Sequence, residues 1–175
     1  MHYYQQQAEA QIAPGKLFEE IPKLKFRAEQ KNCPIDNEPL LVQKTGERTI
    51  KSIGIGIFKA HHTMLYCKRH AELGCWYSDE LAQLAPANSN VAYNVIVAVG
   101  QLRFMENRQV DEIKKILFNK HGVDVSMSEI EILIDKFIFY VAVVHQQSIH
   151  LIREQIKAQG GYILHIDATC EGDSP

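Results

Sequence analysis

The chain has 175 residues and a mass of 20.0 kDa, enough for one ordinary domain or two small ones. Hydrophobic residues make up 46% of it, a share typical of globular proteins, so we do not expect extensive disorder. The longest apolar run, residues 137–144, is far shorter than the roughly 20 residues that a membrane span needs, and the N-terminus lacks an apolar secretion signal. We therefore expect a cytoplasmic protein without a membrane segment.

The net charge of -2 hides an uneven distribution of charge along the chain. Residues 1–70 carry eleven Lys/Arg and seven Asp/Glu, whereas residues 71–175 carry eight and fourteen. A basic first part suits a polyanion such as DNA, although an excess this modest is equally compatible with an ordinary solvated surface.

Residues 1–32 are expected to form a flexible basic leader, because they combine a Gln-rich start with scattered lysines, proline and glycine. Residues 33–75 are predicted to form a small hairpin module. Its strands are expected at residues 40–45, 48–53 and 57–66, with a turn at Gly46-Glu47 and a bulge or close approach at Gly54 and Gly56.

Two short motifs in this module have the spacing of metal ligands. Cys33-Pro34-Ile35-Asp36 and Cys67-Lys68-Arg69-His70 each place two candidate ligands three positions apart, so that a tight loop directs both toward one tetrahedral ion. Thiolate and imidazole suit Zn(II), and aspartate is a less usual ligand. The motifs predict a zinc ribbon whose structural Zn(II) is held by Cys33, Asp36, Cys67 and His70, and a module this small gains much of its stability from such an ion.

Residues 76–159 are predicted to be helical. Ser78 and the two acids after it cap a short helix that stops before Pro86, and a buried scaffold helix is expected over residues 91–106. An amphipathic helix over residues 110–120, a stop at Gly122 and a capping box at residues 126–129 then outline a helix-turn-helix.

The second helix of this pair is expected to be long, reaching Lys157, and either kinked near His145 or shared between two packing partners, which could include a second subunit. Between residues 126 and 144 its only cation is Lys136, whereas a DNA-reading helix presents basic side chains to base edges. From the residues alone, a structural helical hairpin is therefore favoured over a specific DNA reader.

Several motifs follow one another in a distinctive order from about residue 30 to the end of the chain. They are CPID at 33–36, LVQKT at 41–45, RTI at 48–50, FKAHHT at 58–63, SDELAQLAP at 78–86, SEI at 128–130 and GGYILHIDATCEGDSP at 160–175. This series resembles the N-terminal portion of a bacterial insertion-sequence transposase of the DDE class.

The resemblance implies that a zinc-binding and helix-turn-helix region precedes a ribonuclease H-like catalytic domain, whose first strand would be residues 160–175. By position, Asp167 would be the first of three catalytic carboxylates that together hold two Mg(II) ions in a complete family member. The sequence ends eight residues after Asp167, so we expect no catalytic activity from this chain alone.

Together these features predict an α+β protein in which a small β-hairpin zinc ribbon is followed by an all-α, helix-turn-helix-like bundle with one long helix and a terminal strand. The expected function is double-stranded DNA binding at the ends of a mobile element, with possible homodimerisation. The candidate DNA-contacting cations are Lys44, Arg48, Lys51, Lys114, Lys115 and Lys136. The alternative is a zinc-stabilised module for protein interaction or dimerisation. A third reading, Mg(II) bound by Asp167, Glu171 and Asp173, ranks last.

Overall fold

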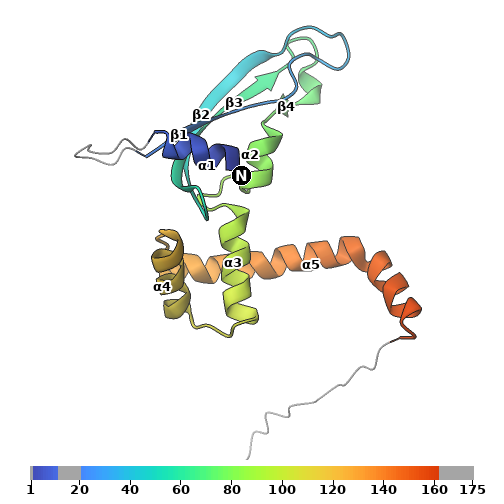
Figure 1. Ribbon diagram of the computed structural model, residues 1–175. Helices are drawn as coiled ribbons and strands as arrows, with labels where there is room; N and C mark the ends of the chain where they lie inside the picture. The colour runs from blue at the N-terminus through green and yellow to red at the C-terminus, as the bar shows by residue number, and fades with distance from the viewer. Residues whose placement is uncertain (1, 12–20, 162–175) are drawn as a thin grey trace, which may run out of the picture. The chain divides into compact units, whose positions relative to one another are not determined.

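The computed structural model describes residues 2–11 and 21–161 and has a mixed α+β fold, which confirms the expected class (Figure 1). In chain order its elements are α1 (His2–Glu9), β1 (Lys23–Arg27), β2 (Leu41–Ser52), β3 (Gly56–Tyr66), the 3-10 helix η1 (Ala71–Leu73), β4 (Cys75–Trp76), α2 (Asp79–Leu84), α3 (Tyr93–Phe104), α4 (Val110–His121) and α5 (Met127–Ala158). No helix in the described ranges combines the length and apolar character needed to cross a membrane.

The chain forms two compact units, residues 1–137 and 138–175. In the second unit, the described residues are the C-terminal part of α5 and the turn after it. We expected a boundary near residue 75 instead. The structure differs because Leu81 and Ala85 of the α2 region pack into the same apolar cluster as the sheet, so the hairpin module and the first helices share one core.

The sheet has the strand order β1-β3-β2, with the short β4 paired to β3. β1 runs parallel to β3, and β2 runs antiparallel to it. β1 corrects the expected flexible leader over residues 23–27. Leu24 and Phe26 alternate with charged residues and are only 3% and 1% exposed. This is the period-two pattern of a strand with one buried face, and we assigned the segment to the leader because of its lysines.

β2 is continuous across Gly46-Glu47, where we expected a turn. Gly46 lies opposite His62 of β3, and a Cβ atom at Gly46 would stand 2.8 Å from the nearest atom of the His62 ring. Glycine is therefore needed here for close packing and not for chain reversal. The reversal occurs at residues 53–55, where Gly54 and Gly56 have φ angles of 90° and 81°.

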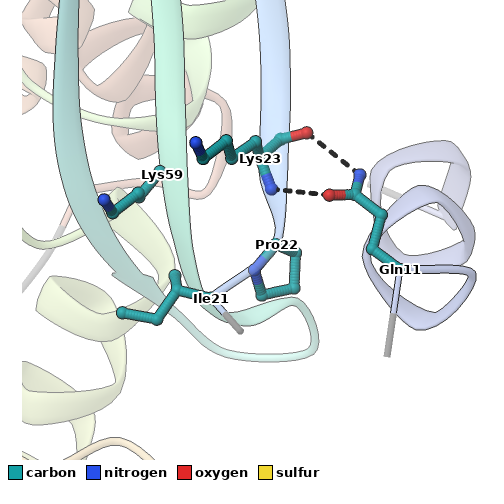
Figure 2. A pocket seen from close by; sticks show the side chains of 5 residues that line it. All are labelled: Gln11, Ile21, Pro22, Lys23 and Lys59. Carbon is teal, nitrogen blue, oxygen red and sulfur yellow. Dashed lines mark hydrogen bonds between the residues drawn. The ribbon is translucent and has the colours of Figure 1, made fainter. Parts of the chain in front are cut away.

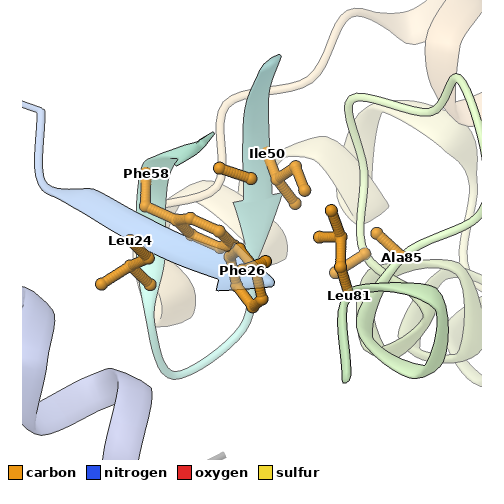
Figure 3. Close-up of a cluster of buried hydrophobic side chains, with 8 residues drawn as sticks. Leu24, Phe26, Ile50, Phe58, Leu81 and Ala85 are labelled. Carbon is orange, nitrogen blue, oxygen red and sulfur yellow. The ribbon is translucent and has the colours of Figure 1, made fainter. Parts of the chain in front are cut away.

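The core of the sheet lies on one face, between the strands and α2 (Figure 3). Its buried residues are Leu24, Phe26, Ile50, Phe58, Ala60, Leu81, Ala85 and Ala92. α1 extends this cluster through Tyr4, whose ring centroid lies 4.9 Å from that of Phe26 and whose hydroxyl donates to the Glu80 carboxylate. Burial raises the pKa of the Tyr4 phenol, and the hydrogen bond to Glu80 acts in the same direction.

The helices begin and end close to their expected positions because their caps are local. Ser78 Oγ accepts the N–H of Leu81 at the start of α2, and Ser126 Oγ accepts the N–H of Glu129 at the start of α5. Gly122 ends α4 in the left-handed conformation with φ 62°. α3, α4 and the start of α5 bury a second apolar group: Val95, Val99, Ile113, Leu117, Ile130 and Leu133. The terminal strand expected at residues 160–175 lies almost wholly outside the described residues.

Candidate metal centre

The first metal-ligand motif forms a narrow turn. The Cys33 N–H donates to the Glu38 carbonyl at 2.8 Å, and the Asn37 N–H donates to the Cys33 carbonyl at 2.9 Å. Pro34 supplies the fixed φ that suits the second position of a turn, and Asn37 adopts a left-handed φ of 57°, which asparagine tolerates better than most residues. This geometry brings the Cys33 and Asp36 side chains to the same side of the loop.

The second motif lies where β3 ends and the chain reverses into β4. Leu65 and Tyr66 pair with Trp76 and Cys75, and η1 occupies the connection between them. Reversal requires Gly74, which has φ 77°. His70 is thereby held at the tip of this short hairpin, beside the first turn.

The structure brings Cys33, Asp36 and His70 together. One ligand atom from each residue lies within 4.8 Å of the other two, and His70 Nε2 is 3.5 Å from Asp36 Oδ2. Zinc–nitrogen bonds of about 2.0–2.1 Å and zinc–oxygen bonds of about 2.0–2.2 Å place the two ligand atoms of a tetrahedral ion roughly 3.3–3.5 Å apart. The His70–Asp36 separation fits such an ion without rearrangement.

The hydrogen bonds around these side chains leave one atom of each directed at the centre. Asp36 Oδ1 accepts the Glu38 N–H at 3.1 Å, while Asp36 Oδ2 is buried and has no hydrogen-bond partner among the described residues. His70 Nδ1 lies 3.1 Å from Glu72 Oε1, so Nε2 remains the ring atom for a ligand bond. A carboxylate on the second nitrogen is the usual support of a metal-binding histidine.

Cys67 is the fourth predicted ligand, and its position differs from that of the other three. It is 3% exposed, and its side chain contributes to the raised pKa of the Cys33 thiol, yet it falls outside the group whose ligand atoms all lie within 4.8 Å of one another. The Cys67 side chain would have to move toward Asp36 and His70 to complete a tetrahedral set.

The electrostatic surroundings act differently on the Cys33 thiol and the Asp36 carboxyl. Burial raises the pKa of Cys33, opposed by the backbone N–H groups of Asp36 and Ile35 and reinforced by the Cys67 and Asp36 side chains. Burial would also raise the pKa of Asp36, but the Glu38 N–H, the Cys33 thiol and the nearby His70 and Arg69 together lower it. A cation would therefore meet a carboxylate at once, whereas binding to Cys33 would release a proton.

Three of the six cations that we expected to contact DNA already have partners within the chain. Arg48 Nη1 donates to the carbonyls of Pro86 and Ser89 at 2.6 and 2.9 Å, and burial lowers its pKa. Lys51 Nζ lies 3.3 Å from Glu129, and Lys115 Nζ lies 3.3 Å from Asp111. Of the other three cations, Lys44 is exposed, and Lys114 and Lys136 are half-buried. Asp167 lies outside the described residues.

Sequence reasoning missed two groups that shape the site. Glu72 contacts His70, and Arg69 stands 3.7 Å from Asp36 and 3.4 Å from Glu38. The only signal available was the position of Glu72 two residues after His70, which is too common a spacing to be informative. Comparison of the chain with protein-family models, with curated proteins and with solved structures found no match.

Proposed function

We infer that this chain is a zinc-stabilised, duplex-DNA-binding module that forms the N-terminal region of a DDE-class transposase. The observation that carries this proposal is the convergence of Cys33, Asp36 and His70. These residues come from two motifs that are separated by 30 residues, and both motifs belong to the region of the chain that resembles this family. A bound Zn(II) would be held by these three residues, with Cys67 as fourth ligand, and would cross-link the two turns without taking part in chemistry.

The arrangement after the sheet supports the same proposal. α4, the turn at residues 122–126 and the start of α5 follow one another as the helix-turn-helix outline requires, and α3 packs beside them. In a complete member of the family, Asp167 would join two further carboxylates around Mg(II). The proposal assigns DNA binding to this chain and strand chemistry to the assembled carboxylates of a complete family member.

Titration of a fluorescent duplex with the whole chain at several salt concentrations tests the proposal. We expect binding that weakens linearly on a log–log plot against salt, because each phosphate contact releases counterions. Absence of binding at low ionic strength would disprove it. A nuclease assay with added Mg(II) is expected to stay negative at concentrations where DNA is bound.

A second candidate function, self-association, is favoured by the second unit. In that part of α5 several large apolar side chains are exposed by half or more: Ile138, Phe139, Val141, Val144 and Leu151. A patch of this kind in a helix is typical of a surface that another chain covers. Sedimentation equilibrium tests it: we expect a dimer that Val141→Lys converts to monomer, and a monomeric parent chain would rule it out.

A further inference from the structure

The face of the sheet opposite the apolar core carries a row of cations that the proposed function does not yet use. Lys23, Lys25 and Arg27 of β1 alternate with the buried Leu24 and Phe26, and all three are exposed. Because successive residues of a strand point to opposite faces, the three cations share the face that points away from the core.

The pairing of β1 with β3 widens this row into a patch. Lys23 lies beside Lys59, Lys25 beside His61 and Arg27 beside Thr63. Alternate residues of a strand are roughly 6.6 Å apart and neighbouring strands roughly 4.8 Å apart, so the patch is a compact array of four cations and one imidazole. We call Lys23, Lys25, Arg27, Lys59 and His61 the outer basic face.

Little negative charge offsets the outer basic face. At the positions of β2 that continue the same rows, Glu47 lies opposite His61 and pairs with Lys59 at 3.2 Å, and Thr49 lies opposite Lys59. Among the described residues, no acidic side chain pairs with Lys23, Lys25 or Arg27. In contrast, the start of α5 exposes Glu131 and Asp135.

The edge of this face is held in place by Gln11, which follows α1. The Gln11 side chain accepts the Lys23 N–H at 2.8 Å and donates to the Lys23 carbonyl at 3.0 Å (Figure 2). Figure 2 shows the ammonium groups of Lys23 and Lys59 pointing to the same side, away from Gln11. Both lysines line a depression of about 490 Å³. The two charges are thus presented on a fixed backbone.

We propose that the outer basic face binds the phosphate backbone of duplex DNA. This assignment rests on the proposed function and names the surface that carries it. Phosphates are the complementary charges, and backbone contacts give affinity and register without reading sequence. The paired positions of the face carry Lys, Arg, His and Thr and no Phe, Tyr or Trp, so the surface lacks the large aromatic stacking platform that single-strand binders use.

Two triple variants of the full chain test the assignment. One is Lys23→Gln, Lys25→Gln and Arg27→Gln on the outer basic face; the matched control is Lys120→Gln, Arg153→Gln and Lys157→Gln, three exposed cations on the helices that are not among the expected DNA contacts. Fluorescence anisotropy measures the affinity for two duplexes of unrelated sequence between about 50 and 200 mM salt. Over this range the affinity of a phosphate-binding protein should change by about tenfold or more. Thermal unfolding shows whether each variant is folded.

For the strand variant, we expect at least about tenfold weaker binding to both duplexes. The slope of log affinity against log salt should become smaller in magnitude by roughly 2–3, because each lost phosphate contact reduces that slope by about 0.9. The helix variant should bind within about twofold of the parent. Parent-like binding by a folded strand variant would overturn the assignment while leaving the proposed function intact. Binding of single strands more tightly than duplex would also overturn it. No binding by the parent would refute both.

Discussion

His70 Nε2 lies 3.5 Å from Asp36 Oδ2, and this contact joins the two chain segments that flank the β2–β3 hairpin. A protonated imidazole would make it an ion pair, but the buried Oδ2 atom has no hydrogen bond among the described residues. A cation between the two atoms would satisfy both, together with the Cys33 sulfur nearby. The contact therefore has the arrangement that the proposed metal site requires.

Metal content gives the first prediction. Protein purified without chelator should hold one equivalent of zinc, and Asp36→Asn should hold less, because the amide is a poorer ligand than a carboxylate. Cys75→Ser is the matched control, since the Cys75 thiol donates to Gln43 and stands outside the group. Mass spectrometry of the metal measures both. A parent without zinc, or a Cys75→Ser variant that loses as much as Asp36→Asn, would contradict the site.

The support of His70 gives the second prediction. Glu72→Gln removes the carboxylate that lies 3.1 Å from His70 Nδ1 and should weaken zinc binding by about 10- to 100-fold, as loss of such supporting groups does elsewhere. Competition with a chromophoric chelator measures the affinity. Glu106→Gln, which removes an exposed acid paired with Arg108, is the control and should bind zinc like the parent. Equal affinities for the two variants would show that Glu72 does not orient the imidazole.

The third prediction concerns Glu29, which caps α2 from a distance. Its carboxylate accepts the N–H groups of Asp79 at 2.9 Å and Glu80 at 3.3 Å and the Ser78 hydroxyl. Burial would raise its pKa, but these hydrogen bonds together lower it. Because the folded-state pKa is depressed, the stabilisation is complete above the ordinary glutamate value of about 4.3 and is lost as pH falls through the folded-state value.

Glu29→Gln should therefore lower the free energy of unfolding at pH 7 by about 0.5–1 kcal/mol, the usual worth of a helix cap at an exposed site. The difference from the parent should shrink as pH falls below about 4.3. Urea unfolding at a series of pH values measures it, with Glu131→Gln as the control for loss of one exposed acid. A difference that is constant from pH 7 to pH 3 would exclude the charged cap.

The parts that could be predicted from the sequence depend on neighbours along the chain. The Ser78 and Ser126 caps and the Gly122 stop act within one turn of helix, so their residue types were sufficient. The spacing of Cys33 and Asp36 is equally local. It predicted a turn that directs two ligands to one side, and the structure has this turn.

What could not be predicted depends on pairing across long distances. We interpreted residues 23–27 as part of a leader, because the strand β1 is paired with β3, which lies far along the chain. Gly46 was interpreted as a turn because nothing nearby indicates that the His62 ring lies against it. Arg48 was interpreted as a DNA contact, although its guanidinium holds the carbonyls of Pro86 and Ser89. In each case the partner is at least 16 positions away.

The last prediction uses a close contact between α3 and α5 at Gly100 and Phe137. Gly100 of α3 is buried, and a Cβ atom at this position would collide with the ring of Phe137, which also stacks on Phe104 at 5.9 Å between centroids. In an exposed helix, replacing glycine by alanine stabilises by about 1 kcal/mol. Here we expect the opposite sign: Gly100→Ala should cost about 1–3 kcal/mol, because the ring has to move out of a packed position.

A double-mutant cycle with Phe137→Ala separates the collision from other effects. The ring is absent in the double variant, so Gly100→Ala should there be neutral or stabilising, and the two changes should be less harmful together than the sum of their separate costs. Urea unfolding at 25 °C measures all four proteins. If Gly100→Ala alone proved as stable as the parent, α3 and α5 would not pack as closely as the structure places them, and the start of α5 would lose the contact that fixes it beside α3.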